Sequence, residues 1–236
     1  MTLVWIPNSL TLGNLLFGFI SLIFSSLGTQ QGYFIAGFLI LAAGLLDGLD
    51  GPAARALKVS SPLGKELDSL ADCVAFGIAP GFLSYNSYLT GIHNSFFSFP
   101  IDLGMLIAAV FPVCAAYRLA RFNILSDSSS FVGLPAPAAG IIIALFHVYN
   151  IEMPKLLFAV IFIALGLLMV STVRYSKPKS SYIFENIHGI KLIIFAVIII
   201  LIVIFFKKWT VFIFISFYIL SGLLSFVIQF IQEHKY

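Results

Sequence analysis

Long apolar runs separated by short polar breaks make up most of this chain. The runs are long enough to cross a membrane as helices, and the breaks include GTQQG, KVSSP and NIEMP. A helix satisfies its backbone hydrogen bonds internally, as the bilayer interior requires. The pattern therefore predicts an all-α fold, a polytopic transmembrane helical bundle. The expected spans are residues 8–27, 32–55, 66–89, 103–122, 132–150, 155–173, 190–206 and 210–231.

The composition excludes a soluble domain. Of the 236 residues, 60% are hydrophobic and 10% are charged, whereas soluble domains carry about 25% charged residues. The two cysteines, Cys73 and Cys114, lie in apolar stretches and offer neither a disulfide framework nor a zinc site. The net charge of +3 gives no indication of nucleic acid, and we expect no such partner. The N-terminus runs directly into the first span, so we expect no cleavable signal peptide.

The basic residues predict the orientation in the membrane. With the N-terminus inside, ten of the thirteen Lys and Arg residues fall on the cytoplasmic side and only Lys155, Lys207 and Lys208 fall outside. We therefore expect a multi-pass protein of the cell (cytoplasmic or inner) membrane, with both termini facing the cytoplasm. The ten inside residues are Arg55, Lys58, Lys65, Arg118, Arg121, Arg174, Lys177, Lys179, Lys191 and Lys235.

Four of the six aspartates gather in one short stretch, residues 45–72. Asp47 and Asp50 are three residues apart at the end of the second span, and Asp68 and Asp72 are four apart at the start of the third. Both spacings put the pair on one face of a helix. The sequence VSSP between them predicts a turn, so the two helices form an antiparallel hairpin. The four carboxylates are therefore expected to converge at the cytoplasmic surface.

So many carboxylates in one place need protons or cations. Two carboxylates about 4 Å apart repel by about 4 kcal/mol at an effective dielectric of 20. An all-oxygen ligand set suits Mg²⁺, Mn²⁺ or Ca²⁺, and four carboxylates indicate two divalent ions of the kind that assist phosphoryl displacement. Gly44, Gly48 and Gly51 would let a ligand approach the backbone, and Arg55 could hold a phosphate. The alternative is an interfacial ion-pair network with small residues that serve helix packing.

The motif of these residues resembles that of a known family. It reads D-x-x-D-G-x-x-A-R, eight residues, then G-x-x-x-D-x-x-x-D, with its fixed positions at Asp47, Asp50, Gly51, Ala54, Arg55, Gly64, Asp68 and Asp72. In this it is similar to the CDP-alcohol phosphotransferases, integral membrane enzymes of phospholipid biosynthesis. The resemblance implies a six-helix membrane core over residues 1–176, and it also implies a homodimer. Residues 177–236 contain the last two spans, which are almost purely apolar and are expected to form an appended transmembrane hairpin.

The resemblance also implies roles for individual residues. Asp47, Asp50, Asp68 and Asp72 would bind two Mg²⁺ or Mn²⁺ ions. Asp72 would act as the general base on the acceptor hydroxyl, with Arg55 as a further catalytic residue. The residues implied in CDP-diacylglycerol binding are Asn14, Asp50, Gly51, Ala54, Arg55, Ser61 and Gly64.

Three further stretches resemble the phosphatidylserine synthase branch of this family: residues 6–19, residues 117–124 with 131–140, and residues 168–179. The implied reaction transfers the phosphatidyl group of CDP-diacylglycerol to L-serine, giving phosphatidylserine and CMP. Arg118 and Arg121 could bind the serine carboxylate, or could serve as positive-inside anchors in contact with lipid. Alternative acceptors are glycerol 3-phosphate and inositol phosphate. A divalent-cation transporter that uses the same aspartates is the alternative from another functional class.

Overall fold

The computed structural model describes residues 3–59, 61–92, 102–124, 131–172 and 174–175, most of them in helices. The chain divides into two compact units, residues 1–126 with 134–171 and residues 127–133 with 172–236. The second unit contains two short strands that pair antiparallel, β1 (Phe131–Val132) and β2 (Arg174–Tyr175). The first contains α1 (Trp5–Ser26), α2 (Gln30–Ala56), α3 (Pro62–Asp72), η1 (Cys73–Ile78), α4 (Ala79–Ser84), η2 (Tyr85–Leu89), α5 (Leu103–Ile124), α6 (Ala136–Val148) and α7 (Lys155–Val170).

These helices confirm the predicted all-α membrane bundle. The segments α3, η1, α4 and η2 follow one another without a break, so that residues 62–89 form one long helix with two π-helical turns. This helix, α1, α2 and α5 are long and apolar enough to cross a membrane, and α6 and α7 are shorter apolar helices. The predicted spans 190–206 and 210–231 lie outside the described residues, as does the predicted hairpin of residues 177–236.

The two largest differences between predicted and observed helix starts, at α3 and α6, have local reasons. The third span begins at Pro62 rather than at residue 66, because Ser61 caps the helix: its Oγ accepts a hydrogen bond from the Gly64 amide at 3.0 Å. The fifth span begins at Ala136 rather than at residue 132. Gly133 has a left-handed backbone, with φ of +78°, and Pro135 follows it closely, so a regular helix starts only beyond them.

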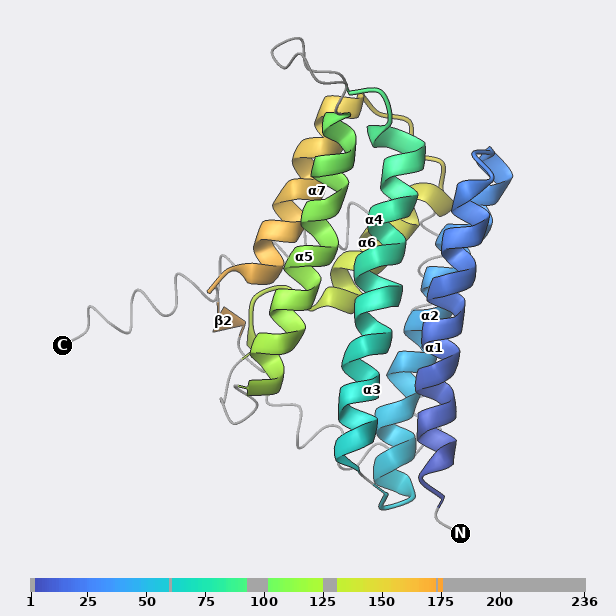
Figure 1. Cartoon of the computed structure of the whole chain (residues 1–236), viewed down its shortest axis with the longest axis vertical. Helices are drawn as coiled ribbons and strands as arrows, with labels where there is room; N and C mark the ends of the chain where they lie inside the picture. The colour runs from blue at the N-terminus through green and yellow to red at the C-terminus, as the bar shows by residue number, and fades with distance from the viewer. Residues whose placement is uncertain (1–2, 60, 93–101, 125–130, 173, 176–236) are drawn as a thin grey trace, which may run out of the picture. The chain divides into compact units, whose positions relative to one another are not determined.

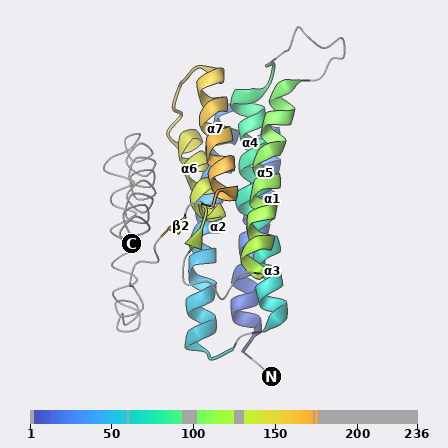
Figure 2. The same cartoon turned by 90° about the vertical axis from the view of Figure 1, so that its left-hand side faces the viewer.

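The helices of the first unit stand side by side in a bundle (Figure 1 and, from another side, Figure 2). Helix α1 packs along α2, α2 packs against α6, and α5 packs against α7. The π-helical segment η1 touches α1, α5 and α6. Glycines allow this approach: a Cβ at Gly18 would lie 2.7 Å from the Cα of Ala75, and one at Gly140 would lie 2.9 Å from the Cα of Phe76. The backbone around η1 is therefore held between two neighbouring helices.

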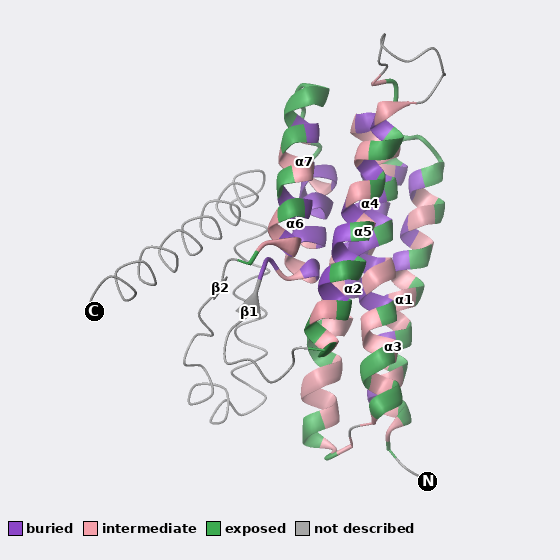
Figure 3. Cartoon of the chain, turned by 60° about the vertical axis from the view of Figure 1, so that its left-hand side comes forward, coloured by how far each residue is buried: buried purple, intermediate pink, exposed green. Residues whose placement is uncertain are grey.

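Burial is uneven along the bundle (Figure 3). The middle is closed by fully buried side chains such as Ile40, Phe76 and Phe111. The last two turns of α2 and most of α3 are only partly covered or exposed. These less covered turns carry the acidic motif, so the fold leaves its charged end open to ligands.

Candidate active site

The aspartates of the motif come together as the spacing predicted. Asp47 and Asp50 lie on α2, and Asp68 lies across from them on α3. One carboxylate oxygen from each lies within 4.8 Å of the other two. Helix α1 packs on both α2 and α3 and adds polar side chains to the cluster.

Asp72 is buried one turn further along α3 and is held by a residue of α1. The Asn14 side-chain amide donates a hydrogen bond to Asp72 Oδ1 at 3.2 Å, from the middle of α1. The Asp47 carboxyl group, on α2, lies close enough to influence the charge on Asp72. Asp72 thus adjoins the three-carboxylate cluster through Asp47, and its orientation is set by α1.

The cluster fits a divalent cation. Its ligand atoms are all carboxylate oxygens, the type that hard ions such as Mg²⁺ and Mn²⁺ prefer. Opposite ligands of an octahedral Mg²⁺ stand about 4 Å apart, so three oxygens within 4.8 Å are already near the spacing that one ion needs. Asp68 Oδ1 is buried and has no hydrogen-bond partner. A buried carboxylate oxygen without a partner is costly unless a cation or donor meets it.

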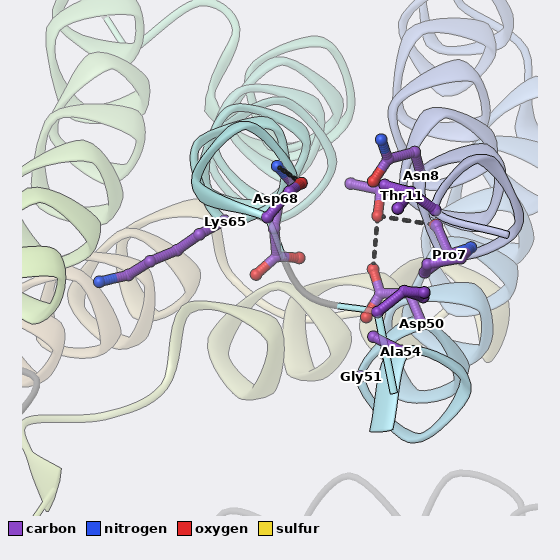
Figure 4. Close-up of a pocket in the computed structure, with 12 residues that line it drawn as sticks. Pro7, Asn8, Thr11, Asp50, Gly51, Ala54, Lys65 and Asp68 are labelled. Atoms are coloured by element: carbon purple, nitrogen blue, oxygen red, sulfur yellow. Dashed lines mark hydrogen bonds between the residues drawn. The ribbon is translucent and has the colours of Figure 1, made fainter. Parts of the chain in front are cut away.

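A cavity of about 250 Å³ opens beside the cluster, between the first turns of α1, the end of α2 and the start of α3 (Figure 4). Several of the residues predicted to bind CDP-diacylglycerol line it. Asn14 and Arg55 are not among its lining residues. The predicted residues that line it, together with the metal-ligand candidate Asp68, are Asp50, Gly51, Ala54, Ser61 and Gly64.

Small residues keep this cavity open. A Cβ at Gly64 would meet Asn8 Oδ1 at 3.1 Å and Ser61 Oγ at 3.2 Å, so a larger residue there would crowd the wall. The guanidinium of Arg55 lies near Gly51, because a Cβ at Gly51 would be 3.4 Å from Arg55 Nη1. Arg55 is exposed. An extended cation at the rim of an acidic cavity is suited to meet a phosphate group.

Gly44 and Gly48, which were also predicted to let a ligand approach the backbone, have different surroundings from Gly51. A Cβ at Gly44 would approach Ile141 Cδ1 at 3.1 Å, so Gly44 serves the packing of α2 against α6. A Cβ at Gly48 would meet nothing within 4 Å. The helix-packing alternative therefore holds for Gly44, whereas Gly51 borders the cavity.

The two acceptor candidates on α5 have different environments. Arg121 donates hydrogen bonds to the carbonyls of Val170 at 2.8 Å, Ser171 at 3.2 Å and Met169 at 3.3 Å. It thereby caps the C-terminal end of α7. Arg118 is buried, with 8% of its surface exposed, and its guanidinium carbon lies 6.0 Å from the centre of the Phe122 ring.

The level of Arg118 in the bundle follows from the register of α5 against the long third helix. Ala115 faces Gly77, and the Asn123 amide donates to Ser69 Oγ at 2.9 Å. The two helices run antiparallel, so Arg118 lies at about the level of the residues just after Asp72. Charged side chains at membrane depth are rare and usually functional, so Arg118 is a candidate for a functional role.

Sequence reasoning missed three polar residues of the cavity: Asn8 and Thr11 on α1, and Lys65 on α3. Thr11 Oγ1 donates to Asp50 Oδ2 at 2.8 Å. A signal was present in the sequence, because Thr11 lies three residues before Asn14 and thus on the same face of a helix. Lys65 lies three residues before Asp68, also on one face.

The chain matches the protein family described as CDP-alcohol phosphatidyltransferase over residues 4–174. It is similar to several proteins named CDP-diacylglycerol–serine O-phosphatidyltransferase, from different organisms. The one from Helicobacter pylori is 37% identical over 73% of this chain and 72% of its own length. The one from Bacillus subtilis is 34% identical over 74% of this chain and 92% of its own length. The one from Methanocaldococcus jannaschii is 32% identical over 77% of this chain and 79% of its own length.

Proposed function

Because this chain belongs to the CDP-alcohol phosphatidyltransferase family, we propose that it transfers the phosphatidyl group of CDP-diacylglycerol to L-serine, giving phosphatidylserine and CMP. The observation that carries the proposal is the convergence of Asp47, Asp50 and Asp68 beside a cavity lined by Gly51, Ala54 and Gly64 of the family motif. The names of the similar proteins support serine as the acceptor rather than glycerol 3-phosphate or inositol phosphate.

The metal ligands would be Asp47, Asp50, Asp68 and Asp72, holding two Mg²⁺ or Mn²⁺ ions. Such ions, when bound, would neutralise the diphosphate of the donor and stabilise the negative charge of the departing CMP. The protein contributes the rigid frame, because the four aspartates come from two adjacent helices whose spacing is fixed by close packing on α1.

The cavity would receive the CDP part of the donor. Gly51, Ala54 and Gly64 leave room along its wall, and Ser61 Oγ lies at the start of α3. Arg55, at its rim, would pair with a phosphate oxygen and favour loss of CMP. Asn14 could accept a hydrogen bond from the donor substrate. Its side-chain oxygen is buried without a hydrogen-bond partner, while its side-chain NH₂ group donates to Asp72.

Asp72 would act as the general base. Its carboxylate would take the proton of the serine hydroxyl, and the serine oxygen would attack the lipid-linked phosphorus. The bond from that phosphorus to the CMP oxygen breaks, and CMP leaves with the electron pair. Asn14 keeps the Asp72 carboxylate in one orientation through its hydrogen bond. A positioned general base accelerates such a reaction by about 10²- to 10⁴-fold.

Arg118 is the stronger of the two candidates for the serine carboxylate. It is the more buried of the two, and it lies on α5 at about the depth of Asp72. An arginine can bind a carboxylate through two parallel hydrogen bonds. We place the active site on the cytoplasmic side of the cell membrane, following the distribution of basic residues. The resemblance also favours a homodimer, and the last two apolar runs favour a C-terminal hairpin of residues 177–236.

The test is release of CMP by the purified protein from CDP-diacylglycerol with Mn²⁺. Serine, glycerol 3-phosphate and inositol phosphate are compared as acceptors. We expect release that depends on serine alone. Release with another acceptor would keep the active site and overturn the choice of serine. No release with any acceptor, together with metal uptake into liposomes, would favour a divalent-cation transporter.

A further inference from the structure

The buried side of α1 is a stripe of small and polar residues. Its members recur every three or four positions, so they form one helix face toward α2 and the long third helix. Most of their polar groups bond to a neighbouring helix. The stripe consists of Pro7, Thr11, Asn14, Gly18, Ser21 and Ser25.

Thr11 is the member of this stripe that reaches the acidic motif. It is 4% exposed, and its Oγ1 donates to Asp50 Oδ2 at 2.8 Å, a contact drawn in Figure 4. We propose that Thr11 is a positioning residue for Asp50, which it holds in the orientation that binds the divalent cation. This inference rests on the metal site of the proposed function, and it assigns a role to a residue outside the aspartate motif.

Asp50 needs support from outside its own helix. Pro52 lies two residues further along α2 and has no N–H, so the carbonyl of Gly48 lacks its usual partner within the helix. The backbone around Asp50 is therefore less constrained than a regular helix. A hydrogen bond from a hydroxyl to a carboxylate is short and charge-assisted. This bond ties Asp50 to α1 through Oδ2, and a carboxylate has further lone pairs with which to bind a cation.

A purely structural role for Thr11 predicts something different. Thr11 Oγ1 also lies 3.1 Å from the carbonyl oxygen of Pro7, one turn earlier on α1, and such bonds are common for threonine in helices. The hydroxyl has a single hydrogen. The bond to Asp50 is shorter and has a charged acceptor, so it is the stronger of the two. If the bond to Pro7 were the important one, loss of the hydroxyl would leave metal binding unchanged.

In other metalloproteins, mutation of a residue that hydrogen-bonds to a metal ligand weakens metal binding about 10- to 100-fold. We expect an effect of this size for Thr11→Val, which keeps the shape of the side chain and removes the donor. Thr11→Ser keeps the hydroxyl and should bind metal nearly as well as the wild type. Thr11→Ala also removes the donor, and serves if the valine variant does not fold.

The matched control is Ser21→Ala. Ser21 is fully buried on the same face of α1, and its hydroxyl donates to the Ala36 carbonyl of α2 at 2.9 Å. Its loss removes a comparable bond between the same two helices, away from the carboxylates. A general loosening of α1 against α2 would therefore weaken metal binding in Ser21→Ala as well.

The experiment measures Mn²⁺ binding to the full-length protein in detergent without substrates, by electron paramagnetic resonance of free Mn²⁺. The dissociation constant should rise about 10- to 100-fold in Thr11→Val and stay within about threefold in Thr11→Ser and Ser21→Ala. An unchanged constant in Thr11→Val, or an equal rise in Ser21→Ala, would overturn the inference. If the wild type binds Mn²⁺ no better than Asp68→Asn, the metal site itself is refuted, and the role of Thr11 with it.

Discussion

Asp68→Asn should make the protein more stable without metal and inactive with it. The substitution keeps the size of the side chain and removes one negative charge from the cluster. Asp47, Asp50 and Asp68 have oxygens within 4.8 Å of one another. At that separation two charges repel by about 3.5 kcal/mol at an effective dielectric of 20, so the variant removes two such pairs, about 7 kcal/mol before screening.

The measurable gain is smaller, because bound protons and water weaken the repulsion. We expect about 2 kcal/mol, which raises Tm by about 5 °C in a chain of this size. The assay is thermal unfolding in detergent with EDTA and then with Mn²⁺. Mn²⁺ should raise the Tm of the wild type, because it binds only the folded state, and should leave that of Asp68→Asn nearly unchanged. CMP release by the variant should fall at least about 10³-fold, since a ligand is lost from the site that stabilises the transition state.

Asp102→Asn is the matched control, the same chemical change at an aspartate outside the cluster. The Asp102 carboxylate accepts hydrogen bonds from the amides of Gly104 at 2.9 Å and Gly91 at 3.0 Å. Its loss of charge should lower Tm by a few degrees and leave the response to Mn²⁺ intact. If Asp68→Asn is less stable than the wild type in EDTA, repulsion among the carboxylates does not destabilise the metal-free protein. The metal assignment fails if Asp68→Asn retains Mn²⁺-dependent turnover.

Three other predictions concern the same site. Excess EDTA should silence CMP release and added Mn²⁺ or Mg²⁺ should restore it, and activity that persists in EDTA would contradict metal dependence. Arg118→Ala should raise the serine KM about tenfold with a smaller change in kcat. Arg121→Ala is the comparison, and an equal rise in KM in both variants would contradict the preference for Arg118 as the residue that binds the serine carboxylate. Ser61→Ala should lower stability by about 1 kcal/mol, because it removes the cap of α3, and a Tm equal to the wild type would show that the cap contributes little.

Much of the fold was readable from the sequence because membrane insertion depends on local properties. A run of apolar residues of sufficient length is a span wherever it stands, and the spacing of the aspartates along α2 and α3 fixes which face of each helix they share. The motif together with Ser61 likewise identified half of the residues that line the cavity, because the connection between α2 and α3 is short. The errors fell where backbone geometry overrides hydropathy, at the cap residue Ser61 and at Gly133.

Only the tertiary structure decided which side chains meet across helices. The bonds from Thr11 to Asp50 and from Asn14 to Asp72 depend on how α1 is rotated and how far it is shifted along its neighbours. That register is set by close contacts such as Gly18 against Ala75, which no periodicity in a single helix reveals. The sequence by itself determined the spans and the acidic chemistry, because both follow from residues near one another in the chain. The supports of the carboxylates come from residues far apart in the chain, and packing alone brings them together.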